Sequence, residues 1–148
     1  MTSFSHYSDL TLYYYDGNYA PALQLNVCSV HALNKIKQMF KCLRQGEIKK
    51  ASLVNQLGVT SINKLIDVML ISSDKSQKFF QKNLELVSHV NSLFLFKWIL
   101  DRDGWETVIE LIEPLIEKDS PAHQYLTEEG IDDALFTISY LEEKGWVG

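Results

Sequence analysis

The sequence predicts a single α+β domain in which a mainly antiparallel sheet is packed by two main helices. Three observations predict this class. The 148 residues are about the size of one domain, and their content of 46% hydrophobic and 22% charged residues is that of an ordinary globular protein. Helix-like and strand-like patterns are interspersed along the chain. No linker, internal repeat or low-complexity tract divides them, so we expect one domain over residues 1–148.

The sheet is expected to begin with an N-terminal hairpin. Residues 10–15 and 22–27 are both rich in strand-forming side chains, and the turn-forming triplet Asp-Gly-Asn at 16–18 lies between them. This order of strand, turn residues and strand is typical of a hairpin with an extended loop.

The first main helix is expected between Ser29, a favourable N-cap, and Gly46, a favourable stop. Apolar residues recur there with helical spacing, at Leu33, Ile36, Phe40 and Leu43. The outer face is basic and carries Lys35, Lys37, Lys41 and Arg44.

Later strands are expected in the middle of the chain. Residues 65–71 form a short apolar run bounded by polar residues, which favours a buried strand but is also compatible with a helical segment. Residues 79–86 are ambiguous and mildly favour a strand. Residues 93–100 are crowded with aromatic and aliphatic side chains, so we expect a central strand there.

The second main helix is expected to start with Asp103 as N-cap and Glu106 in the capping-box position. Its two faces then segregate cleanly. The apolar face holds Trp105, Val108, Ile109, Ile112, Leu115 and Ile116, and the acidic face holds Glu106, Glu110, Glu113 and Glu117. Pro114 is expected to kink or end this helix. Residues 134–141 alternate with a period of two, which predicts the last strand.

Charge is distributed unevenly along the chain. Residues 1–100 hold 11 Lys and Arg against 6 Asp and Glu, whereas residues 101–148 hold 3 against 13. A large patch of one sign in a small domain speeds encounter with an oppositely charged partner. We therefore predict an acidic partner-binding surface, made of Asp101, Asp103, Glu106, Glu110, Glu128, Glu129, Asp132 and Asp133.

Catalytic motifs are absent from the sequence, which contains no phosphate-binding glycine loop, dinucleotide glycine motif, HExxH or GxSxG. Cys28 and His31 could share a metal, but two ligands make no zinc site and no second pair follows. The acidic pairs at 128–129 and 132–133 could serve acid–base chemistry, yet nothing supplies a nucleophile or a basic partner. We expect no catalytic residue, no cofactor and no metal, although an enzyme of unrecognised type remains an alternative.

Residues 51–66 suggest a different function. They loosely resemble a helix-turn-helix with Gly58 at the turn, and they lie in the basic half of the chain. Phosphate binding recruits several basic side chains, but the second helix would carry only Lys64, and the chain has only two arginines. A DNA-binding regulator is therefore the alternative, and we do not expect a nucleic-acid partner.

The last third of the chain resembles small bacterial immunity proteins. The segments that carry the likeness are residues 96–105, 111–115, 123–126 and 131–134. The likeness is to immunity proteins that guard against polymorphic toxins, including contact-dependent growth inhibition systems. It implies a cytoplasmic, non-catalytic protein that binds one cognate toxin domain and blocks its active site or substrate path. Such proteins share no universal functional residues, so the resemblance assigns none here.

The charge pattern agrees with what this resemblance implies. Toxin domains that cut nucleic acid need basic clefts to hold phosphates, and an acidic surface can occupy such a cleft. Trp105, Trp146 or residues 13–15 could supply aromatic anchors, although Trp105 lies on the apolar side of its helix. The N-terminal residues do not resemble a secretion signal, and no apolar run reaches the roughly 18 to 20 residues of a membrane span. We therefore expect a cytoplasmic protein with no membrane partner.

Overall fold

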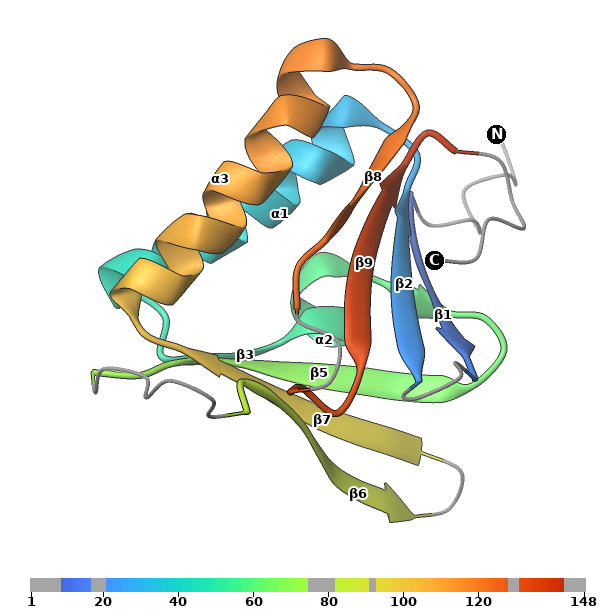
Figure 1. The fold of residues 1–148 in the computed structure, drawn as a ribbon, viewed down its shortest axis with the longest axis vertical. Coiled ribbons are helices and arrows are strands. Elements are labelled where there is room, and N and C mark those ends of the chain that lie inside the picture. The colour runs from blue at the N-terminus through green and yellow to red at the C-terminus, as the bar shows by residue number, and fades with distance from the viewer. Residues whose placement is uncertain (1–8, 17–20, 75–81, 91–92, 128–130, 143–148) are drawn as a thin grey trace.

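Three layers surround one core in the computed structural model, which describes residues 9–16, 21–74, 82–90, 93–127 and 131–142. Two sheets run across each other, and a pair of helices closes the third side (Figure 1). Successive segments of the chain contribute strands first to one sheet and then to the other, so neither sheet is built from one continuous stretch of sequence. The structure is therefore a single α+β domain, as expected.

The first sheet has five strands in the order β4-β1-β2-β9-β8. They are β1 (Leu10–Tyr15), β2 (Ala22–Val27), β4 (Thr60–Ser61), β8 (Ala122–Tyr125) and β9 (Leu135–Tyr140). β1 and β2 form the expected antiparallel hairpin, but β9 pairs with β2 in parallel. This sheet is therefore mixed, with two antiparallel and two parallel pairs, whereas mainly antiparallel pairing was expected. Local sequence patterns mark strands without recording which partner each strand meets or in which direction.

The second sheet has four strands in the order β3-β5-β7-β6. They are β3 (Lys50–Ser52), β5 (Leu65–Ser72), β6 (Leu84–Val90) and β7 (Leu93–Leu100). β7 lies inside the sheet, as expected, where it is parallel to β5 and antiparallel to β6. The ambiguous stretch at 79–86 becomes a strand only from Leu84, and residues 79–81 lie outside the described residues.

The described residues form three helices: α1 (Val30–Gln45), α2 (Leu53–Leu57) and α3 (Arg102–Lys118). α1 has the predicted ends. The Ser29 hydroxyl accepts a hydrogen bond from the backbone N–H of Ala32, and Gly46 ends the helix with a φ of 77°. Glycine adopts this left-handed backbone conformation without steric cost, because it has no Cβ.

α3 continues through Pro114 to Lys118, so this proline does not end the helix, which was one of the two effects expected of it. Pro114 has no N–H to donate to the carbonyl of Glu110. The proline lies on the exposed face of the helix, where a carbonyl can turn towards water instead. The lost hydrogen bond is therefore tolerated at this position.

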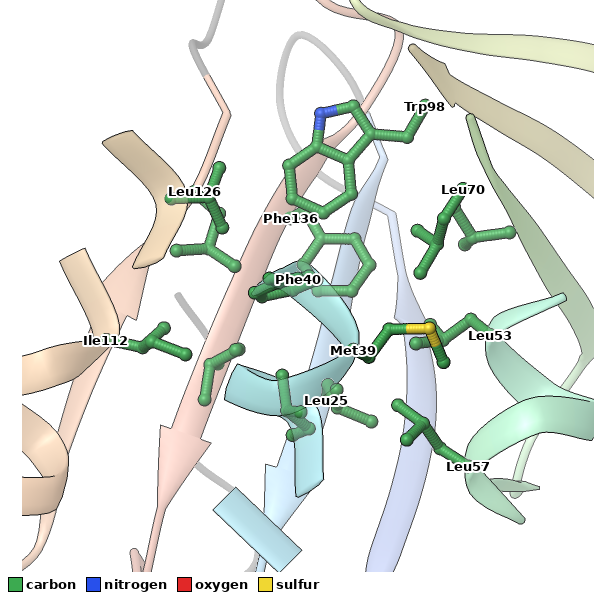
Figure 2. Close-up of a cluster of buried hydrophobic side chains, with 14 of the residues drawn as sticks. Leu25, Met39, Phe40, Leu53, Leu57, Leu70, Trp98, Ile112, Leu126 and Phe136 are labelled. Carbon is green, nitrogen blue, oxygen red and sulfur yellow. The ribbon is translucent and has the colours of Figure 1, made fainter. Parts of the chain in front are cut away.

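The core is built around Trp98 of β7, which is 1% exposed (Figure 2). Its ring lies 5.2 Å from Phe136 of β9 and 5.2 Å from Trp105 of α3, measured between centroids. The Phe40 ring of α1 meets it edge-on at 6.1 Å. One side chain thus contacts both main helices and the other sheet. Trp105 is fully buried, which confirms its expected place in the core.

β9 is buried more completely than its alternating sequence predicts. The five residues from Phe136 to Tyr140 are all buried, although they point alternately to the two faces of the sheet. β9 lies between β2 and β8, where an internal strand has little contact with water. Alternation in the sequence therefore located the strand but did not predict burial of both faces.

The end of α3 is tied to β9 by a hydrogen bond from the Tyr140 hydroxyl to the carboxylate of Asp119. Asp119 caps the helix in a left-handed conformation, with a φ of 47°. Burial of Tyr140, the hydrogen bond and the negative charge of Asp119 together raise the pKa of Tyr140 from 10 to about 12. The neutral phenol is therefore the form that the fold stabilises.

Replacing Asp119 tests this link. Asp119→Asn keeps an acceptor oxygen but removes the charge, so the pKa of Tyr140 should fall from about 12 towards 10. The pKa is measured from the tyrosinate absorbance as the pH is raised. The absorbance of the same protein carrying Tyr140→Phe is subtracted, so that only Tyr140 contributes. In the wild type, the contribution of Tyr140 to stability should be complete below pH 10 and lost as the pH rises to about 12. Glu117→Gln is the matched control, and an equal shift there would contradict the assignment.

Candidate protein-binding surface

α3 begins two residues earlier than expected. Asp101, not Asp103, is the N-cap, and its Oδ1 accepts a hydrogen bond of 2.8 Å from the backbone N–H of Gly104. Glycine is needed at 104 because a Cβ there would lie 2.9 Å from the Cβ of Leu100. Asp101 therefore serves the helix start, while Asp103 lies exposed in the first turn, where a carboxylate is favourable to the helix dipole.

The acidic face of α3 is partly used inside the fold. α1 and α3 lie side by side (Figure 1), so the basic face of one meets the acidic face of the other. Lys37 pairs with Glu113 at 3.0 Å, and Arg44 pairs with Glu106. Partly exposed pairs of this kind each contribute about 0–1 kcal/mol. Glu106, predicted as a partner-binding residue, is thus already paired within the chain.

A narrower acidic stripe remains on the outer side of α3. It consists of Asp103, Glu110 and Glu117, which are all exposed. Two turns of helix separate neighbours, so successive carboxylates lie about 10 Å apart along one face. Across the part of the chain that the structure describes, none of the three carboxylates has an ion pair or a hydrogen bond. We call these three residues the α3 stripe.

A groove of about 540 Å³ lies at one end of the α3 stripe, where β5 ends and α3 begins. Both arginines of the chain reach it, together with Lys49 and the carboxylates of residues 74, 101 and 103. Lys49 and Asp74 form an exposed ion pair at 3.2 Å. The lining carries both signs of charge, so the groove suits a polar protein segment better than a simple anion. The sequence predicted Asp101 and Asp103 as binding residues, but it did not predict Asp74 or the position of these carboxylates beside Arg44 and Arg102.

Asp132 and Asp133 lie away from the α3 stripe and hold the start of β6. Asp132 is 8% exposed, and its Oδ1 accepts hydrogen bonds from the backbone N–H groups of Asn83 and Leu84. Asp133 accepts one from Leu86 and pairs with Lys82 at 2.8 Å. The expectation that Asp132 is part of an open acidic surface is therefore corrected. Glu128 and Glu129 lie outside the described residues.

Residues 51–66 do not form the two helices of a helix-turn-helix. The segment contains the end of β3, the five-residue helix α2, the two-residue strand β4 and the start of β5. Gly58 does turn the chain, with a φ of 70°, but strand follows it. The element that would enter a DNA groove is absent from this segment.

The aromatic residues considered as anchors are not prominent on the surface. Residues 13–15 are all partly buried, and Tyr14 stacks on Phe94 with centroids 4.8 Å apart. Trp146 lies outside the described residues. Several exposed apolar side chains lie instead on β6, at Leu86, Val87 and Val90, where the sequence did not predict them because this edge strand has no clear alternation.

Within the described residues, no group of three or more His, Cys, Asp or Glu side chains could hold a metal ion. Cys28 is exposed, and His31 lies in the first turn of α1. No helix in this part of the chain is long and apolar enough to cross a membrane.

Comparison of the chain with protein-family models, with curated proteins and with solved structures finds no match.

The Asp133 contacts predict a specific pH dependence of stability. Burial alone would raise the pKa of Asp133, but the Lys82 ammonium and the Leu86 N–H outweigh it and hold the pKa below 3.8. The stabilisation should thus be complete above pH 3.8 and lost as the pH falls through the lowered pKa. Asp133→Asn should remove the loss of unfolding free energy that protonation of Asp133 causes at low pH. Urea unfolding at successive pH values measures this free energy. Asp74→Asn, at an exposed site, is the control and should leave the dependence unchanged.

Proposed function

We propose that this protein is a non-catalytic immunity protein that binds and neutralises a cognate bacterial toxin domain. The observation that carries the proposal is the α3 stripe, three exposed carboxylates on one rigid helix that the fold itself does not use. Among the described residues, six ion pairs join other charged side chains to one another, whereas the three carboxylates of the stripe belong to none of these pairs.

The partner that fits such a stripe is a protein with a basic cleft. A toxin domain that cleaves nucleic acid holds phosphates with Lys and Arg, and an acidic helix laid along that cleft would satisfy the same cations. The long-range attraction would also steer the encounter and raise the association rate. The mixed-charge groove at the start of α3 would bind polar groups at the edge of the same contact.

Charge reversal on the α3 stripe tests the proposal. The product of the gene immediately upstream is co-expressed with this chain, growth is scored, and the association rate of the two purified proteins is measured at rising salt. We expect wild type to restore growth, and Glu110→Lys with Glu117→Lys to slow association about tenfold or more at low salt. The salt dependence should weaken in parallel.

The matched control is Glu47→Lys, an exposed carboxylate in the turn after α1. It changes the net charge in the same direction, by two units against four, without touching α3, so its effect should be much smaller than half of that of the stripe variant. If the stripe variant protects as well and binds as fast as wild type, the stripe is not the binding surface. If the upstream product is neither toxic nor bound, the immunity function itself is rejected.

A further inference from the structure

β6 is the edge strand of the second sheet and pairs with β7 alone among the described strands. Figure 1 shows it on the outer side of that sheet, away from both main helices. An edge strand presents unpaired N–H and C=O groups, to which another strand can add. Natural proteins usually cover or interrupt such an edge.

The first half of this edge is covered by Asp132 and Asp133. The carbonyl of Asn83 accepts from Ile99 of β7, so the next residue, Leu84, points its backbone groups outwards. Leu84 donates its N–H to Asp132 at 3.0 Å, and its carbonyl accepts from the N–H of Asp133 at 2.9 Å. Two residues thus satisfy the outward groups that a neighbouring strand would otherwise bind.

The carboxylate of Asp133 extends this cover by one more outward group. Its Oδ2 accepts from the N–H of Leu86 at 2.8 Å, while its Oδ1 pairs with Lys82. Two other charged groups lie close to this carboxylate. The Lys82 ammonium, two residues before β6, lowers the pKa of Asp133, and Glu85 in turn raises the pKa of Lys82. Without this side chain, the N–H of Leu86 would be free to donate a hydrogen bond to another strand.

The second half of the edge exposes three apolar side chains among polar ones. Leu86 is 40% exposed, Val87 50% and Val90 61%. Val90 also begins a row of exposed side chains across the sheet, because it lies opposite Leu93, which lies opposite Leu65. Pairing is irregular between Leu86 and Ser88, and such a bulge is a common way to discourage strand addition.

We propose that Asp132 and Asp133 guard a self-association edge, and that loss of the Asp133 side-chain oxygen that accepts from Leu86 lets β6 pair with β6 of a second copy of this chain. Two copies meeting in antiparallel fashion would bring their exposed valines together. In the same arrangement Glu85 of each copy would lie opposite His89 of the other, so no two side chains of like charge would face each other.

The test compares two substitutions of one residue by sedimentation equilibrium. Asp133→Ala frees the N–H of Leu86 and should strengthen dimerisation about tenfold over wild type. Asp133→Asn keeps an acceptor oxygen in the same place and should associate no more than about twofold more strongly than wild type. Near-ultraviolet dichroism of the buried tryptophans reports whether each variant is folded.

A second substitution identifies the edge that associates. Val87→Lys added to Asp133→Ala places a charge on the strand and should return the dimer constant to the wild-type value. The proposal is overturned if folded Asp133→Ala associates no more than wild type, or if the added lysine leaves its association unchanged. Should Asp133→Ala not fold, Asp133→Ser provides the test, since it also removes the carboxylate that accepts from the N–H of Leu86, and absence of strengthened association there would equally reject the proposal.

Discussion

The packing of Trp98 is the interaction on which the rest of the structure depends. Its ring contacts Phe136 of the first sheet, and it also contacts Trp105 and Phe40 of the two main helices. Trp105 in turn donates its indole N–H to the carbonyl of Ile71, at the end of β5. The two sheets cross, and this aromatic cluster joins both of them to the two main helices. Aromatic pairs add to the burial of their large apolar area.

The docking of α1 on α3 also determines which charges are left for function. The basic face of α1 and the acidic face of α3 would each look like a binding surface in isolation. Once the helices pack, Arg44 and Lys37 neutralise Glu106 and Glu113. The α3 stripe remains because its three side chains are exposed and are not among the carboxylates that pair with α1. The proposed contact with a toxin is therefore a consequence of the same packing that buries Trp105.

The sequence was sufficient to locate the hairpin, both main helices and the central strand β7, because each has a strong local pattern, and it favoured a strand at β5 over a helical segment. It could not predict that β2 and β9 are parallel, since that pairing joins segments more than a hundred residues apart. β3, β4 and β8 are too short for a pattern to develop. For the candidate surface, the acidic residues of α3 were identified from spacing alone. The roles of Asp101 as a cap and of Asp132 as a buried acceptor depend on neighbours that only the fold brings together.

The most direct test of the central role of Trp98 is native-state hydrogen exchange of Trp98→Leu. If one aromatic cluster unites the layers, amides of α1, β2, β7 and β9 should all lose protection together, by about 2–3 kcal/mol. The loss should be equal in the two sheets, because they would unfold as one cooperative unit. A loss confined to β5, β6 and β7, with α1 and β2 protected as in wild type, would contradict this account and indicate that the second sheet is stabilised separately.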